Sequence, residues 1–237
     1  MDAINTQVVI LAVSRMGNQV CVAGVDEDKK WVRPTSPSKE GGWEFKLSDI
    51  YDKNNDPVIA LSNTVAIRLI KRVPAEGSPQ KENWEYDRRQ KPVLVEILSE
   101  QQRLKLFQAI SEKKLEPLVE KNEKSLCLIE PSFIFFVNLS NISVKGKWQP
   151  RISFAFNEIP YEFPVTDIYW RAICRSLQKK TGKKLLDGGE LKKIIGYNRI
   201  FLTIGLPRGK IKNQYWPMIV GVHPVPLFPI KIDYRNP

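Results

Sequence analysis

Apolar and polar residues follow one another along the chain in short blocks, a pattern that is typical of β-strands joined by turns. Residues 6–16 are almost continuously aliphatic, and residues 19–25 and 30–35 follow after turn signals, which predicts a three-stranded meander. Residues 63–73 alternate apolar and polar side chains and predict a further strand. Strands of this length with turns between them indicate a small closed barrel.

A few helices are expected among the strands. Ser99 and Gln102 have the spacing of a capping box, which predicts a helix directly after them. Thr166 is the expected N-cap of a second, amphipathic helix, and Gly182 stands where a C-terminal glycine stop belongs. Residues 187–196 predict a third, short helix. The fold class is therefore mainly β with a few helices (α+β).

The second part of the chain has its own strands. Ser132–Asn138 is apolar at nearly every position and predicts a strand that is buried on both faces. Residues 199–206 and 215–222 are two further apolar strands, and a basic loop, 207–214, connects them. The chain thus repeats a strand-rich plan, although no internal sequence repeat is strong enough to establish a duplication.

Charge divides the chain more sharply than hydrophobicity does. Residues 1–144 carry 20 Lys and Arg against 20 Asp and Glu, whereas residues 145–237 carry 17 against 6, so the whole net charge of +11 lies in the second part. Such asymmetry points to a polyanionic partner, most commonly nucleic acid. An anionic membrane surface and a merely soluble basic surface are the alternatives.

Composition excludes several other classes of protein. No apolar run reaches the roughly 18 residues that a membrane span needs, and the first residues, MDAINTQ, lack the features of a secretory signal. Cys21, Cys127 and Cys174 lie far apart and form no metal-binding pair or disulfide framework. We therefore expect a reduced, cytoplasmic protein with no membrane association and no cofactor.

The hairpin that ends in Trp31-Val-Arg33 carries the first candidate binding residues. Trp31 and Arg33 are two positions apart on a strand, so both project from one face. A large ring beside a guanidinium suits stacking on a base and pairing with a phosphate. The alternative is that Trp31 belongs to the core and Arg33 is a surface charge.

Further candidates for nucleic-acid contacts are basic or aromatic residues that emerge from strands, from the second helix and from the basic loop. The alternatives for them are the wet side of an amphipathic helix, a solvated loop and core packing. These candidates are Arg15, Arg171, Arg175, Lys179, Arg208, Lys210, Lys212 and Trp216.

The sequence shows no catalytic or metal-binding constellation. His223 is the only histidine and has no visible partner, so a structural role is favoured. Asp26 and Asp28 lie at a charged hairpin tip, which is solvated far more often than it holds a metal ion. Cys21 lies in an apolar strand, where a cysteine is usually inert. We expect neither a catalytic residue nor a bound metal.

Three stretches resemble the bacterial dual OB-domain proteins, which are described as nucleic-acid modification or binding proteins. They are the hairpin Cys21–Pro34, the pair Leu202–Arg208 and Trp216–Pro224, and the strands that lead into Val165–Asp167. The resemblance implies two small OB-like β-barrels packed together. We assign residues 1–144 to the first, with a helical segment, and residues 145–237 to the second, with one amphipathic helix.

Together these features predict a non-catalytic protein that binds nucleic acid, DNA or RNA and in single-stranded form, on a basic groove with aromatic stacking. The resemblance further implies a role in a nucleic-acid modification or phage-defence system. The first alternative is a protein-interaction subunit of a larger complex. The second is an enzyme that acts on nucleic acid, with Asp26, Asp28, Asp49 or His223 as its reactive groups.

Overall fold

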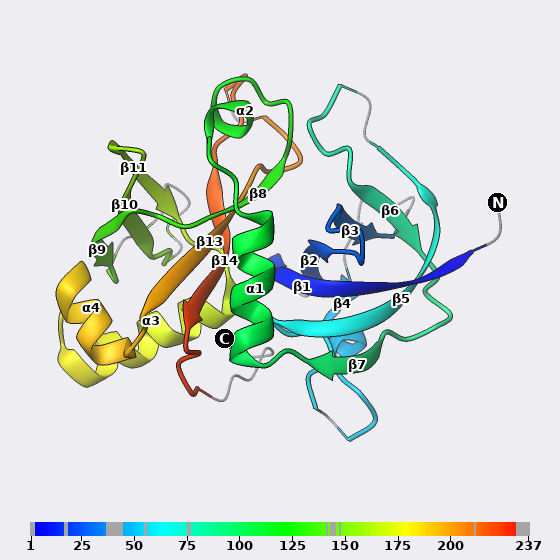
Figure 1. Ribbon diagram of the computed structural model, residues 1–237, viewed down its shortest axis with the longest axis horizontal. Helices are drawn as coiled ribbons and strands as arrows, with labels where there is room; N and C mark the ends of the chain where they lie inside the picture. Colours follow the sequence, from blue (N-terminus) through cyan, green and yellow to red (C-terminus); the bar gives the residue numbers. More distant parts are fainter. Residues whose placement is uncertain are drawn as a thin grey trace.

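The computed structural model describes residues 3–16, 19–36, 45–54, 56–74, 77–140, 142, 146, 148–210 and 212–230 of the 237-residue chain. Strands predominate, as the sequence predicts, and four α-helices lie among them in this part of the chain (Figure 1). The tight turn that is predicted at residues 17 and 18 lies outside the described residues.

The elements have the following bounds in chain order: β1 (Ile4–Met16), β2 (Gln19–Val25), β3 (Trp31–Thr35), β4 (Phe45–Lys46), the 3₁₀-helix η1 (Leu47–Ile50), β5 (Asn63–Arg72), β6 (Asn83–Tyr86), β7 (Val93–Ile97), α1 (Glu100–Ile110), α2 (Glu116–Val119), β8 (Leu126–Ile129), β9 (Phe133–Asn138), β10 (Arg151–Phe156), β11 (Ile159–Pro164), α3 (Ile168–Thr181), β12 (Leu185–Asp187), α4 (Gly188–Ile195), β13 (Arg199–Gly205) and β14 (Met218–Val225).

The first barrel is a closed circuit of five strands. β1 is long enough to pair with β2 along its second half and with β5 along its first half. β2 pairs with β3, β3 pairs with β6 in parallel, and β6 pairs with β5, which returns to β1. The circuit β1-β2-β3-β6-β5-β1 is that of a small Greek-key barrel of the OB type. β7 extends the sheet beyond β5.

The second barrel follows a similar strand order in two sheets, with its first strand divided into β8 and β9. β9 pairs with β10 and β10 with β11, while β8, just before β9 in the chain, pairs with β13 and β13 with β14. A parallel bridge between Val165 and Ile219 joins the end of β11 to β14. The parallel contact again links the third strand to the last one, but here it is a single bridge between two sheets, β11-β10-β9-β12 and β14-β13-β8.

The boundary between the barrels differs from the boundary in charge. β8 and β9 lie within residues 1–144, yet they pair with strands of the second barrel. The second barrel therefore begins near Leu126, and β7, α1 and α2 form the connection from the first barrel. The change at residue 145 marks where positive charge begins to exceed negative charge, inside the second barrel.

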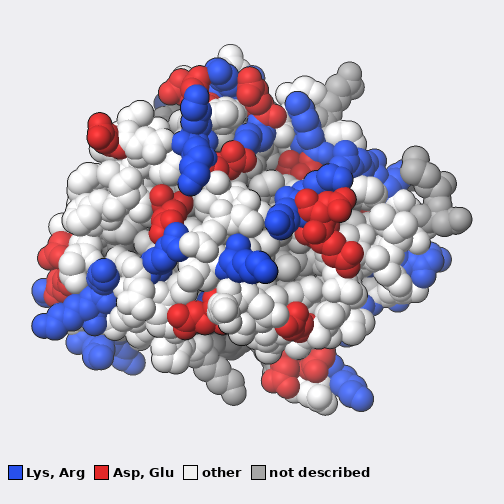
Figure 2. Space-filling model, viewed as in Figure 1, with Lys and Arg blue, Asp and Glu red and all other residues white. Residues whose placement is uncertain are grey.

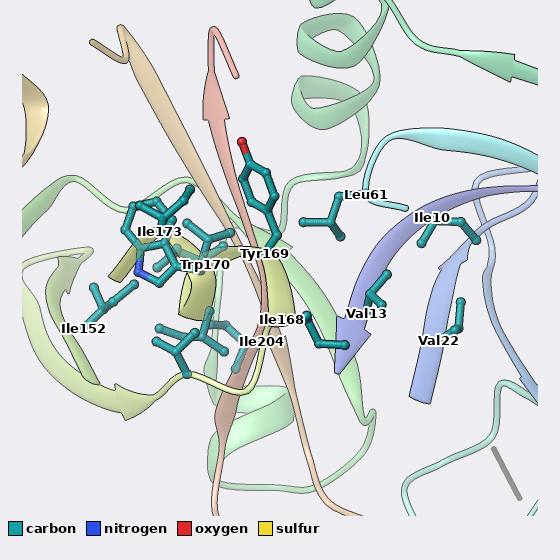
Figure 3. Packing of buried hydrophobic residues seen from close by; sticks show 14 of the residues in the cluster. Ile10, Val13, Val22, Leu61, Ile152, Ile168, Tyr169, Trp170, Ile173 and Ile204 are labelled. Carbon is teal, nitrogen blue, oxygen red and sulfur yellow. The ribbon is translucent and has the colours of Figure 1, made fainter. Parts of the chain in front are cut away.

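One hydrophobic core runs through both barrels. Figure 3 shows Ile10, Val13 and Val22 of the first barrel on one side, and Ile152, Trp170 and Ile173 of the second on the other. Ile168 lies between the two groups, next to Val13. Because these side chains belong to one continuous cluster, burial of apolar surface stabilises both barrels and their junction together.

Hydrogen bonds at the junction converge on the carbonyl oxygen of Leu11 in β1. The hydroxyl of Thr203 donates to it at 2.9 Å, and Nε2 of His223 lies 3.1 Å from it. Nε2 also lies 2.9 Å from the hydroxyl oxygen of Thr203, and with the hydroxyl proton directed at Leu11, an imidazole protonated on Nε2 can donate to both oxygens. His223 is fully buried, and burial lowers its pKa from 6.5 to about 3, so it is a neutral structural donor.

The carboxylate of Asp167 makes the second polar link of the junction. One oxygen accepts the N–H of Tyr169 at 2.8 Å and so caps α3, while the other accepts the N–H of Val222 in β14 at 2.8 Å. A bridge between Ser14 and Asp167 adds the end of β1. The predicted cap at Thr166 is thus wrong by one residue, because only the buried Asp167 reaches both donors. Burial raises the pKa of Asp167 from 3.8 to about 7.

Two further helix signals in the sequence are confirmed, and one burial prediction is wrong. The Ser99 and Gln102 capping box begins α1, and Gly182 ends α3 with a φ of 69°. β9 is not buried on both faces, since Phe133 is 56% exposed and Phe135 is 39% exposed. In the described part of the chain, no helix combines the length and apolarity needed to cross a bilayer.

Gly221 determines how closely the barrels approach. A Cβ at this position would lie 2.1 Å from the oxygen of Leu11 and 2.9 Å from Nε2 of His223.

We expect Gly221→Ala to lower the free energy of unfolding by at least about 3 kcal/mol, because the added atom meets backbone and displaces the donors of Leu11. Urea unfolding measures this. Gly209→Ala, where a Cβ meets nothing within 4 Å, is the control, and equal stability of the two variants would contradict the assignment.

Asp167 and His223 also predict a pH dependence with opposite signs. The pKa of Asp167 is raised in the folded state, so its contribution to stability is present below pH 3.8 and is lost as pH rises to about 7. The pKa of His223 is lowered in the folded state, so its contribution to stability is present above pH 6.5 and is lost as pH falls to about 3. The two slopes oppose each other over the shared range. Relative to wild type, the stability of Asp167→Asn should therefore rise with pH, and that of His223→Gln should fall, each by up to about 1.4 kcal/mol per pH unit.

Urea unfolding of the three proteins at a series of pH values between 4 and 6.5 checks these slopes. Gln is chosen at position 223 because its amide can still donate to Leu11. Parallel pH profiles for wild type and both variants would show that neither group titrates as the junction geometry requires.

Candidate nucleic-acid interface

The amphipathic helix α3 positions the first group of basic residues. Its inner side buries Trp170, Ile173 and Leu177 in the core, so residues at the intervening positions face outward. Arg171, Arg175 and Lys179 recur at every fourth position, as the sequence predicts. The bridge between Ser14 and Asp167 places the end of β1, with Arg15, beside the first turn of this helix.

Two arginines of α3 lie over one indole ring. The guanidinium carbon of Arg171 is 5.5 Å from the ring centroid of Trp148, and that of Arg175 is 4.9 Å from it. The indole N–H donates to the carbonyl of Leu139 at 2.6 Å, which fixes the plane of the ring. We call Arg15, Trp148, Arg171 and Arg175 the junction cluster.

The charges of Arg171 and Arg175 are not neutralised by the described acidic residues. Neither side chain forms an ion pair within the described part of the chain, and Nε of Arg171 is buried without a hydrogen-bond partner there. Burial lowers the pKa of Arg171, and the charges of Arg175 and Arg15 lower it further. An anion at this position would relieve the mutual repulsion of the three guanidinium groups.

The positive surface continues from the junction cluster to the end of α3 and onto α4. Lys179, Lys180 and Lys184 are exposed, as are Lys192 and Lys193. Lys183 is also exposed but pairs with Glu190 at 2.5 Å. Figure 2 shows a concentration of blue side chains at its lower left, where α3 and α4 lie in Figure 1. We call these lysines the helix corner.

The loop between β13 and β14 holds the second group of predicted residues. Arg208, Lys210 and Lys212 are exposed, and Nζ of Lys210 lies 5.5 Å from the ring centroid of Tyr215. Trp216 is 53% exposed. The loop lies near the top of Figure 1, beside α2, whereas α3 and α4 lie at the bottom. The structure therefore divides the predicted residues between two sites instead of bringing them together.

Trp31 and Arg33 belong to neither group. Trp31 is half-buried and packs against two small apolar clusters between the barrels. The guanidinium of Arg33 binds Glu82 at 2.9 Å and the Ser125 hydroxyl at 3.0 Å, with 15% of its side chain exposed. Ser125 precedes β8 of the second barrel and also donates to the Glu82 carboxylate at 2.5 Å, so its hydrogen bonds connect this ion pair of the first barrel to the second.

Comparison with known proteins identifies the family of the chain. A family model described as "Dual OB-containing domain" matches residues 6–219, which include nearly all of both barrels. The chain belongs to the dual OB-containing domain family. No curated protein matches the sequence.

Solved structures similar to this dual OB-containing chain include "Crystal structure of Ifi202 HINa domain in complex with 20bp dsDNA". The identity is 12% and the TM-score 0.31, over 92% of this chain and 93% of that chain. A TM-score of this size does not support an argument about function.

The four side chains considered as reactive groups of an enzyme all make contacts within this dual OB-containing protein. His223 lies in the junction, Asp26 accepts the N–H of Lys30 at 2.8 Å, and Asp28 pairs with the ammonium of Lys30 at 2.9 Å. Asp49 accepts the N–H of Lys46 at 3.1 Å. Within the described residues, no three His, Cys, Asp or Glu side chains gather as a metal-binding group.

Sequence reasoning missed Trp148 as part of the candidate interface. It follows a short basic stretch, Lys145-Gly-Lys147, which is the only signal in the sequence. Its relation to α3, which begins 20 positions later, depends on the closure of the second barrel and is not visible in local spacing.

Arg33 provides a test of the link between the barrels. We expect Arg33→Ala to lower the free energy of unfolding by about 2 to 3 kcal/mol, because it leaves the Glu82 carboxylate poorly hydrated and without its cation. Urea unfolding measures the loss. Lys30→Ala, which removes an ion pair with 64% and 72% of its side chains exposed, should leave stability unchanged. Equal effects of the two changes would assign Arg33 to the surface.

Proposed function

We propose that the protein binds nucleic acid, with the phosphate backbone following a track from the junction cluster along α3 to the helix corner. The single observation that carries the proposal is the pair Arg171 and Arg175 over Trp148, neither of which forms an ion pair with a described acidic residue. Guanidinium groups held at fixed positions suit phosphate oxygens, which they bind in a bidentate manner.

The track has the chemistry of backbone binding. Its exposed lysines supply mobile positive charges, and its arginines supply directed donors. Most of the affinity of such a surface comes from release of counterions, which does not depend on base sequence. Membership of the dual OB family supports the same partner, since OB barrels present a face and loops to oligonucleotides and oligosaccharides.

Single-stranded DNA or RNA is the form that we propose. Trp216, with 53% of its surface exposed, offers a stacking platform beside the cations of the β13–β14 loop. Base stacking on an aromatic side chain contributes about 1 to 3 kcal/mol per base and requires an unpaired base. The bridge from Val165 to Ile219 brings the end of this loop near the segment that leads into α3, so one strand can reach both sites.

We further propose that the chain binds without catalysing a reaction and serves a nucleic-acid modification or phage-defence system. The first part is supported by the structural contacts that occupy His223 and the three aspartates. The second part follows from the family resemblance alone.

Fluorescence anisotropy with labelled oligonucleotides tests the track. We expect Arg171→Gln combined with Arg175→Gln to weaken binding about tenfold to a hundredfold at low salt. On a single strand it should also reduce the slope of log affinity against log salt by about 1.4, since each phosphate contact contributes about 0.7. Lys53→Gln combined with Lys105→Gln is the control, because it removes two exposed charges from outside the track.

The outcomes separate the proposed sites. Absence of binding by the wild type would overturn the function, and equal loss in both double variants would reduce it to an effect of net charge. If only the combined change Arg208→Gln, Lys210→Gln and Lys212→Gln weakened binding, the site would be the loop instead of the track. Loss of preference for single strands in Trp216→Ala would support stacking there, and an unchanged preference would contradict it.

A further inference from the structure

The strand β7 is an open sheet edge with apolar side chains in solvent. It pairs with β5 on one side only, and it ends the order of strands in its sheet (Figure 1). All five of its residues are exposed, with Val93 at 61%, Leu94 at 39%, Val95 at 48% and Ile97 at 67%. Exposed backbone donors and acceptors next to apolar side chains form a template for a further strand.

The other strands that end a sheet in the described part of the fold are buried or protected against such pairing. β8 is buried at all four positions and β14 at seven of eight. β11 carries Pro160 and Pro164, which cannot donate to a neighbour, and Glu162 between them. β12 has three residues and β4 has two. β7 contains neither lysine nor proline, and its single irregularity is a bulge at Val95 on the side of β5. Its edge is therefore the least protected.

Charges around β7 are arranged so that the edge complements itself. Exposed Arg88 and Lys91 precede the strand, whereas Glu96 and Glu100 lie at its other end, and all four are exposed. In an antiparallel pair of identical strands related by a two-fold axis, the beginning of one strand faces the end of the other. Basic residues of each copy then face acidic residues of the other, with the apolar residues between them.

We propose that β7 is the edge through which two copies of this chain associate. The two strands pair antiparallel and join the first-barrel sheets of both copies into one sheet, in which the Val, Leu and Ile side chains contact each other across the strands. Pairing consumes the open edge of each copy, so the assembly closes at two chains. Five residues bury much less than the about 800 Å² per partner of a standard interface, so we expect dissociation constants in the micromolar range.

Sedimentation velocity of the full chain without nucleic acid tests this pairing directly. The mean mass should rise from 27.3 kDa toward twice that value as concentration increases from about 1 to about 200 µM. Val95→Lys should keep the chain monomeric, because lysine at an edge opposes pairing and the position is already half exposed. Ile159→Lys, at a 52% exposed position of β11, is the matched control and should still associate.

Charge reversal gives a second test that does not depend on stability. The variant with Arg88→Glu and Lys91→Glu has two acidic ends, and the variant with Glu96→Lys and Glu100→Lys has two basic ends. Each should remain monomeric alone, because like charges face each other in its homodimer. An equimolar mixture should restore the dimer, since every facing pair is then complementary.

Four results would overturn the proposal. They are a wild type that stays monomeric at every concentration, association that persists in Val95→Lys, a mixture of the charge variants that stays monomeric, and a mass that continues to rise beyond two chains. Because no nucleic acid is present, these results are independent of the proposed function.

Discussion

The buried carbonyl oxygen of Leu11 is the constraint on which the arrangement of the two barrels depends. A backbone acceptor that leaves water must find a donor, and β1 has turned this one away from its own sheet toward the second barrel. Thr203 and His223 supply the donors, and Gly221 supplies the space. Asp167 stabilises the same junction, because its carboxylate accepts backbone hydrogen bonds from α3 and from β14. The two barrels are thus joined by a shared core and by these polar contacts.

The junction also explains why the junction cluster exists. Arg15 comes from the first barrel and Arg171 and Arg175 from the second, and they approach only because β1 ends beside the first turn of α3. Repulsion among guanidinium groups is an energetic cost that the packed core can sustain. The indole of Trp148 lowers this cost, since its electron-rich face attracts two of the cations. An anion bound beside Arg171 and Arg175 would lower the remaining repulsion between them.

Sequence reasoning succeeds here where the signal is local. The capping box at Ser99 and the glycine at position 182 act within one helical turn, and both are found in the structure. Sequence reasoning fails where tertiary contacts decide the environment of a side chain. Arg33 and its partner Glu82 lie far apart in the sequence, and the exposure of Phe133 depends on which elements cover β9. The connectivity of β8 and β9 is also decided at a distance, since Leu126 of β8 pairs with Gly205 of β13, and charge composition does not report pairing. The expectation of two OB barrels rested on the family resemblance, which the family match supports.

The position of the helix corner has a consequence for how the molecule moves. Positive charges gather at the helix corner and on the β13–β14 loop, whereas acidic and basic side chains balance over residues 1–144, so the net charge is distributed unevenly over the molecule. In the field of a polyanion such a molecule experiences a torque as well as an attraction. If the proposed function holds, this torque would turn the basic surfaces toward the polyanion before contact, and a larger share of collisions would begin in a productive orientation.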